Sequence, residues 1–289
     1  MSAIIMLMLP AFCACVVLLG IHVYLGIHVL SRGVIFVDLA LAQVAALGVT
    51  TALLLGAEPG SGTTYAVSLG FTMVGALLFT FARGLSDRVP VEAIIGIVYA
   101  VASAIAVILA DRLPHGADEI REILVGDLLA VQWPHIVKTA IIYAAIGAFH
   151  FAFRRQFLLI STDPERAEAE GIRIPLWDLL FYLSFGVVIT SAVAIGGVLI
   201  VFSYLVIPAV IVALFTRDLT KRLFAGWGVG ILASALGMYT SYTLDTPTGA
   251  AVVACFGGLL LVAIGLSRFV ELPAAAEQSP RVGHQRTAK

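Results

Sequence analysis

Runs of about 20 or more apolar residues follow one another along almost the whole 289-residue chain. A helix needs about 20 such residues to cross a bilayer core, where the backbone must satisfy its own hydrogen bonds. The sequence therefore predicts an all-α membrane protein, a polytopic bundle of transmembrane helices. Only 12% of residues are charged, and the net charge is -1. So apolar a chain with so few charges cannot be a soluble globular enzyme or a disordered chain, and its net charge gives no basic surface for nucleic acid.

We expect eight or nine transmembrane helices and favour nine, within one transmembrane domain over residues 1–270. The expected spans are about 4–30, 34–56, 65–82, 91–110, 135–153, 179–199, 203–216, 223–243 and 250–267. The first run lacks a basic residue before it, so it is interpreted as a retained span and not a signal peptide. Residues 271–289 are polar and predict a disordered cytoplasmic tail.

The apolar run from Leu179 to Phe215 is too long for one span. It must turn inside or near the membrane, and Gly196-Gly197 and Pro208 are the natural places for a helix to stop or bend. This turn is the reason for splitting the run into spans 179–199 and 203–216.

Basic residues fall mostly on one side of this topology, which is therefore predicted to be cytoplasmic. That side holds Arg32, Arg83, Arg88, Arg154, Arg155, Arg166, Arg173, Arg217, Lys221, Arg222 and Arg268. Only Arg112, Arg121 and Lys138 fall on the other side. The N-terminus is then outside and the C-terminus cytoplasmic. Of the two long polar stretches, 111–133 lies outside and 154–178 inside.

Three polar residues within the spans are candidates for function, because polar groups in lipid are costly. His22 lies on the first span, and Asp38 and Gln43 lie on the second. Asp38 needs either a cation or a structural partner, for instance Arg32. Gln43 either faces the same ion or bonds a neighbouring helix. Both interpretations stay open for each residue.

The sequence contains none of the common nucleotide-binding or hydrolytic motifs. There is no G-x-x-x-x-G-K, no H-E-x-x-H and no G-x-S-x-G. The three cysteines, Cys13, Cys15 and Cys255, lie in apolar runs and are interpreted as packing residues. We therefore expect no enzymatic activity of this chain and no cofactor bound by it.

Within the inner polar stretch, residues 161–172 predict a short helix. Asp163 or Thr162 would cap it, Pro164 would occupy its first turn, and Gly171 would end it. Its small alanines offer no core-forming stripe. Such a helix is either a docking element for a partner or an ordinary solvated connector.

Five segments, in order, resemble permease subunits of metal-ion ABC transporters of the ABC-3 family, the zinc and manganese importers. The 163–172 loop is similar to the family's D-P-E-x-A-x-x-x-G, and residues 92–98 to E-D-x-x-I-G-I-V. Residues 124–131 are similar to L-F-G-(N/D)-I-L-x-V, residues 198–209 to V-G-x-L-L-V-x-A-L-L-V-I-P-A, and residues 241–249 to S-Y-x-L-D-x-P-x-G.

The resemblance implies the architecture of the vitamin B12 importer permease and a bacterial inner-membrane location. It also implies a homodimer in the lipid bilayer, two ABC ATPase subunits that use ATP, and an extracytoplasmic solute-binding protein. The transported substrate would be a divalent metal ion, zinc or manganese. The ATPase-coupling helix would comprise Asp163, Pro164, Glu165, Arg166, Ala167, Ala169, Glu170 and Gly171.

One segment departs from the family pattern. The second span of the family carries G-D-A-L-S-H, whereas residues 37–43 read V-D-L-A-L-A-Q. Gln43 replaces the histidine but lies five positions after Asp38, about 140° away on a regular helix, unless a π-bulge restores the shared face. The metal ligands implied are thus Asp38 and Gln43, and His22 could supply the missing nitrogen.

Two functions remain at this stage. One is the ABC permease subunit for divalent metal, driven by a separate ATPase. The other is a self-sufficient secondary transporter or channel that uses intramembrane Asp38.

Overall fold

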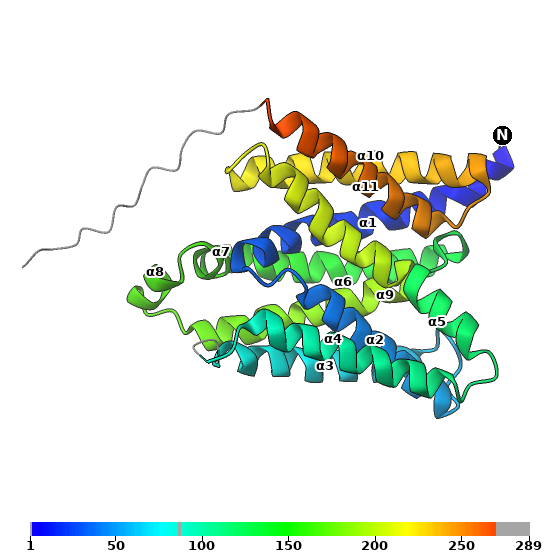
Figure 1. Cartoon of the computed structure of the whole chain (residues 1–289), viewed down its shortest axis with the longest axis horizontal. Coiled ribbons are helices and arrows are strands. Elements are labelled where there is room, and N and C mark those ends of the chain that lie inside the picture. Colours follow the sequence, from blue (N-terminus) through cyan, green and yellow to red (C-terminus); the bar gives the residue numbers. More distant parts are fainter. Residues whose placement is uncertain (1, 86–87, 270–289) are drawn as a thin grey trace, which may run out of the picture.

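The computed structural model describes residues 2–85 and 88–269, and every regular element in these ranges is a helix (Figure 1). The predicted tail, 271–289, lies outside the described residues. The elements are α1 (Ser2–Arg32), α2 (Val37–Leu54), α3 (Gly62–Arg83), α4 (Val91–Ala110), α5 (Gly116–Val125), η1 (Leu128–Ala130), α6 (Trp133–Ala152), α7 (Arg154–Thr162), α8 (Pro164–Ala169), α9 (Ile174–Ala213), α10 (Leu219–Leu244) and α11 (Thr248–Ser267).

Eight of the described helices are long and apolar enough to cross a membrane. They are α1, α2, α3, α4, α6, α9, α10 and α11. The predicted all-α membrane bundle is therefore confirmed. The expected span 91–110 coincides with α4, and most other expected spans differ from the helices by a few residues at each end.

The longest helix, α9, contains the break that the sequence predicted at Gly196-Gly197. Gly197 has φ 70° and ψ 171°, a conformation that only glycine adopts readily. The chain reverses direction there, so that its two halves run as a V through the bundle (Figure 1). The expected boundary at 199–203 is therefore wrong, and the helix continues through Pro208 to Ala213. Counted as two arms, α9 reconciles the nine expected spans with eight helices.

The helix α9 also begins earlier than expected, because it includes Asp178. The sequence interpretation placed this charged residue in the polar loop before the span. Its side chain is instead only 3% exposed and is neutralised by arginines from two other helices. Because two arginines offset its charge, Asp178 can lie inside a buried helix, and the helix does not have to end before it.

The central position of α9 organises the bundle. It packs against α1, α2, α3, α10 and α11. The apolar side chains that remain exposed belong mainly to the outer helices, as expected for surfaces that face lipid. Examples are Val74, Phe81, Ile97, Ile108, Ile141, Tyr239, Leu261 and Val262.

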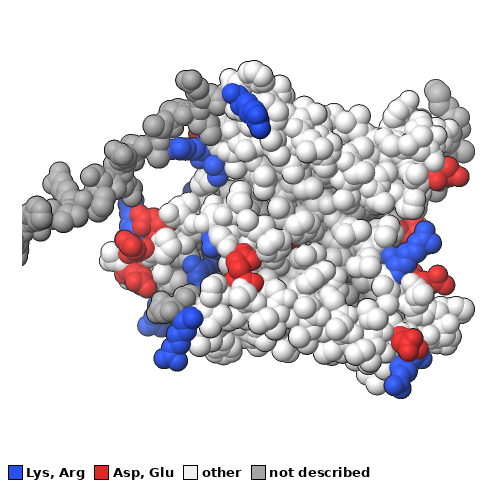
Figure 2. Space-filling model, viewed as in Figure 1, with Lys and Arg blue, Asp and Glu red and all other residues white. Residues whose placement is uncertain are grey.

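The two polar stretches lie at opposite ends of the helices. The segment α5–η1 lies at the end where α1 begins, and α7 and α8 lie at the other end (Figure 1). Charged side chains gather toward these two ends and leave a broad uncharged band between them (Figure 2). This arrangement agrees with the predicted placement of residues 111–133 and 154–178 on opposite sides of a membrane.

Candidate functional site

The short helix predicted around residue 163 is α8, and its local design matches the sequence expectation. Asp163 caps it, since its Oδ1 accepts a hydrogen bond from the Arg166 backbone N–H at 3.0 Å. Pro164 occupies the first turn, and Gly171 follows the helix with φ 76°. Thr162, the alternative cap, belongs to the preceding helix α7.

The surface of α8 is almost entirely exposed. Only Ala167 is buried, while the remaining residues of the predicted coupling helix are exposed or, for Asp163, half-buried. Among them, Glu170 accepts hydrogen bonds from Arg155 Nη2 at 2.7 Å and from Arg166 Nε at 3.1 Å. These exposed ion pairs add little stability, and the pair with Arg155 connects the end of α8 to the start of α7.

The helix α7, which the sequence did not predict, fastens α8 to the bundle. Phe157, Ile160 and Ser161 are buried, and α7 packs against α1, α6 and α9. We refer to α7 and α8 together, residues 154–169, as the α7–α8 segment. It combines an inner face rooted in the membrane domain with an outer face that is open to a partner.

A buried charged group lies beneath the α7–α8 segment. Asp178 Oδ1 accepts hydrogen bonds from Arg32 Nη1 at 2.7 Å and from Arg83 Nη1 at 2.8 Å. Arg32 also donates from Nε to Ser161 Oγ at 2.8 Å. We call Arg32, Arg83, Asp178 and Ser161 the Asp178 cluster. It connects α1, α3 and α9 with the α7–α8 segment.

Asp38 lies in the first turn of α2 and is fully buried. Its suggested pairing with Arg32 is wrong, because Arg32 binds Asp178 instead. Neither carboxylate oxygen of Asp38 has a hydrogen-bond partner among the described residues. The carboxylate of Glu92, at the start of α4, is close enough to interact with it electrostatically. The helix N-terminus favours a negative charge there, but Asp38 forms no ion pair with any cation in the part of the chain that the structure describes.

The other two predicted metal ligands lie apart from Asp38. Gln43 is buried on the same helix, and α2 is a regular α-helix throughout, so the two side chains point about 140° apart. His22 is buried on α1, where its Nδ1 donates to the Leu18 carbonyl at 2.6 Å. The helices α1 and α2 make almost no direct contact. Among the described residues, no three His, Cys, Asp or Glu side chains gather into a metal site. The ligand role of these residues stays a prediction.

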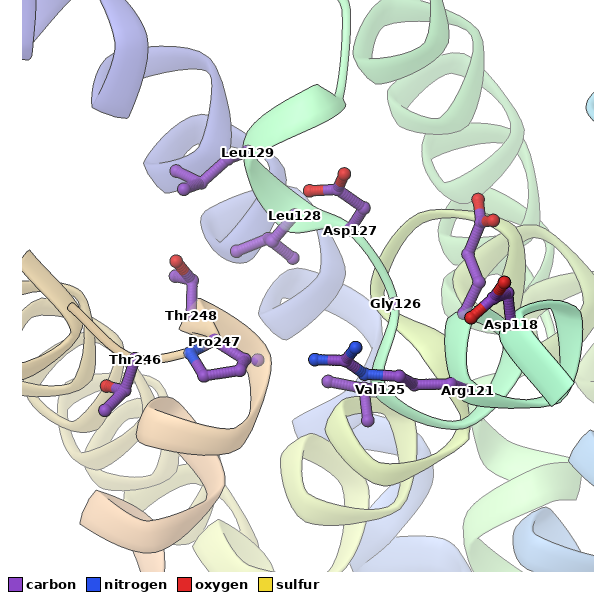
Figure 3. A pocket seen from close by; sticks show the side chains of 12 residues that line it. Asp118, Arg121, Val125, Gly126, Asp127, Leu128, Leu129, Thr246, Pro247 and Thr248 are labelled. Atoms are coloured by element: carbon purple, nitrogen blue, oxygen red, sulfur yellow. The ribbon is translucent and has the colours of Figure 1, made fainter.

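At the opposite end, a cavity of about 400 Å³ lies between α5 and the start of α11 (Figure 3). Its polar lining consists of Asp118, Arg121, Glu122, Asp127, Thr246 and Thr248. Arg121 extends from α5 toward Pro247 (Figure 3). On the same helix, partial burial and then the neighbouring Glu122 raise the pKa of Glu119. Because its lining includes both acids and Arg121, the cavity is polar and carries both signs of charge.

Close backbone contacts at Gly126, Gly197 and Gly249 join the segments next to this cavity. Gly126, which follows α5, lies directly against the backbone of Gly196 and Gly197 at the break in α9. Gly249, at the start of α11, lies against the Val125 carbonyl. At each position an added Cβ would overlap backbone atoms. This close backbone packing joins two of the segments that carry the family resemblance, 124–131 and 241–249, to the break in α9 directly before a third, 198–209.

The sequence profile of the ABC 3 transport family matches residues 5–267. The chain belongs to the ABC 3 transport family. The resemblance predicted from the five segments is thereby confirmed, and the protein is a multi-pass membrane component of an ABC transport system.

Curated relatives of this ABC 3 family member include two transport proteins. It is 29% identical to the manganese transport system membrane protein MntC of Listeria monocytogenes over 202 residues, which covers 68% of this chain and 71% of MntC. It is 24% identical to the high-affinity zinc uptake system membrane protein ZnuB of Haemophilus influenzae over 260 residues, covering 89% of this chain and 97% of ZnuB.

Among solved structures, the fold of this family member is similar to PsaBC from Streptococcus pneumoniae in complex with Fab. The TM-score is 0.76, with 23% sequence identity, and the match covers 89% of this chain and 91% of that chain. The likeness extends over nearly the whole bundle and supports the transporter fold described above.

Proposed function

We propose that this chain is the membrane-spanning permease subunit of an ABC importer for divalent metal ions, with manganese or zinc as substrate. The observation that carries the proposal is the family match over residues 5–267, which includes the exposed, well-capped α8. The curated relatives are named for manganese transport and zinc uptake. We infer a homodimer that assembles with two ATPase subunits and receives metal from a solute-binding protein.

The α7–α8 segment has the properties that a docking element for the ATPase requires. Its outer face is exposed and charged, its helix is fixed by the Asp163 cap, and its inner face is anchored by Phe157 and Ile160. We propose that it faces the cytoplasm, which places the start of α1 outside. The excess of Arg and Lys on the same side of the predicted topology supports this orientation.

The docking role is tested with Glu165→Lys combined with Glu168→Lys, two exposed acids on α8. The permease is co-expressed with the ATPase subunit of its transporter, and the complex is purified through the permease. We expect the charge reversal to release the ATPase or to abolish metal-stimulated ATP hydrolysis. Glu58→Lys, in the exposed α2–α3 loop at the opposite end, is the matched control and should leave both intact. An α8 variant that keeps both the complex and metal-stimulated ATP hydrolysis would contradict the proposal.

The substrate is tested by metal accumulation. Cells that lack this chain should take up less manganese or zinc at limiting supply, and the wild-type chain should restore the uptake. Unchanged contents of both metals would exclude the proposed substrates. The departure at Gln43 favours a cation that accepts an amide oxygen, and thus manganese over zinc.

A second candidate function rests on Asp38, whose fully buried carboxylate has no partner within the described part of the chain. Such a residue could serve a secondary transporter or channel driven by a gradient. Liposomes that contain this chain alone discriminate the two. The ABC permease predicts no metal uptake without ATPase and ATP, whereas gradient-driven uptake would support the alternative.

A further inference from the structure

Ser161 is a buried junction on α7 at which every hydrogen-bonding group is used. Its hydroxyl donates to the Phe157 carbonyl at 2.8 Å. Its oxygen accepts from Arg32 Nε at 2.8 Å and lies 2.8 Å from His28 Nδ1. A serine hydroxyl has one proton and two lone pairs. Since the proton is given to the carbonyl, His28 Nδ1 must be the donor in its contact. Ser161 thus receives two hydrogen bonds from α1.

Arg32 extends this connection to the start of α9. Its guanidinium lies 4.0 Å above the ring of Phe181, measured from Cζ to the ring centroid, and its Nη1 donates to Asp178 Oδ1. The side chain is only 1% exposed. The rigid, planar guanidinium bonds Ser161 and Asp178 at the same time, so a displacement of either partner relative to the other would strain or break one of the two bonds.

The positions of the three charges on their helices strengthen the connection. Arg32 and Arg83 are the last residues of α1 and α3, and Asp178 is in the first turns of α9. Cations are favoured at the C-terminal ends of helices and anions at the N-terminal ends. The Asp178 cluster therefore joins three helix ends at the level of the membrane domain nearest to the α7–α8 segment.

We propose that Ser161 and Arg32 are positioning residues that make the α7–α8 segment move as one body with the adjoining ends of α1, α3 and α9. The inference rests on the proposed function, because the force would come from an ATPase docked on α8. A displacement of α8 is then transmitted through Ser161 and Arg32 to Asp178 and Arg83. Without this connection, α8 would move more freely against the bundle, and more ATP would be hydrolysed for each ion transported.

The first test uses the full transporter, co-purified with its ATPase and reconstituted in proteoliposomes that contain the solute-binding protein. ATP hydrolysed per metal ion transported is measured for Ser161→Ala and for Thr162→Ala. Thr162 is the matched control: it lies on the same helix and donates to the Leu158 carbonyl at 2.9 Å, but it is exposed and makes no bond to α1.

We expect Ser161→Ala to raise the ATP used per ion by about fivefold or more, the lower range of a typical coupling energy between sites. Thr162→Ala and Ser161→Thr, which keeps the hydroxyl, should behave as wild type. A Ser161→Ala complex that couples as wild type would overturn the proposal. If wild-type complexes neither bind an ATPase nor transport metal, it is the proposed function that fails.

A second measurement needs no variant of the cluster. Spin labels are placed at the exposed positions Glu168→Cys on α8 and Phe81→Cys on α3, in a background without the native cysteines. One-body motion predicts the same distance distribution between the labels without nucleotide and with trapped ATP. A distribution that shifts between these states would show that α8 moves independently of α3, and would refute the inference even if Ser161→Ala does not fold.

Discussion

Arg32 and Asp178, 146 positions apart in the sequence, are joined by a 2.7 Å hydrogen bond between Nη1 and Oδ1. Arg83 donates to the same oxygen, so two cations share one buried carboxylate. The resulting ion triad closes the ends of three helices directly beneath the segment that we propose to bind an ATPase. Its stability and its coupling role can be tested separately.

Asp178→Asn should destabilise the protein strongly. The substitution keeps the shape of the side chain but leaves two guanidinium groups without their counter-charge, and breaking a buried pair in this way costs about 3–5 kcal/mol. Denaturant unfolding in detergent measures the change. Glu170→Gln is the matched control, because Glu170 also joins two arginines but at the exposed surface, where we expect a loss of at most about 1 kcal/mol. Equal losses for both variants would show that burial of the triad is not important.

Asp163→Ala should loosen α8 without affecting the membrane domain. Loss of a capping side chain costs about 1 kcal/mol, and α8 is too short to form without its cap. Hydrogen exchange at Arg166 should become faster, while exchange in α9 stays slow. Asp218→Ala removes an equivalent cap, a 3.0 Å bond to the Lys221 N–H at the start of α10. It should affect α10 alone, and unchanged exchange at Arg166 in Asp163→Ala would contradict the prediction.

Most of the bundle could be predicted because membrane spans are encoded locally. Residues 91–110 are apolar except for Glu92 and Ser103 and lie between Pro90 and Asp111, and α4 has these same bounds. The cap at Asp163 and the break near Gly197 were predicted for a similar reason, since each depends on the backbone preference of one residue.

The Asp178 cluster could not be predicted from spacing. Its bonds span 95, 129 and 146 positions, and a single sequence contains no signal that joins them. Arg32 was assigned to the nearest acid, Asp38, because only neighbours can be compared without a structure. The helix α7 was missed because residues 154–162 are too short and too polar for a span, although Phe157 and Ile160 bury one face of it.

Gly197→Ala should disrupt the packing of the end that carries α5. A residue with a side chain pays about 1–3 kcal/mol for a disfavoured backbone conformation, and the new Cβ would also overlap the backbone at Gly126. We expect a clear loss of stability in thermal unfolding. Gly147→Ala on α6 has open space for a Cβ and should be neutral or stabilising. If Gly197→Ala were equally tolerated, the tight contact between α5 and α9 would not exist in solution.

Asp38→Asn should abolish transport without unfolding the protein. The carboxylate is fully buried and has no partner among the described residues, so its replacement by a neutral amide of equal size removes a desolvation cost and should not reduce stability. If Asp38 binds the transported ion, metal affinity should fall by at least about tenfold, the loss seen when even an outer-shell partner of a metal ligand is removed.

Metal binding to the purified complex and uptake in proteoliposomes provide two readouts. Thr50→Val on the same helix, which removes a buried hydroxyl bonded to the Ala46 carbonyl, is the control and should retain both. Full uptake by Asp38→Asn would show that Asp38 does not bind the transported ion and serves only the structure at the start of α2. It would also remove the main support for the gradient-driven alternative.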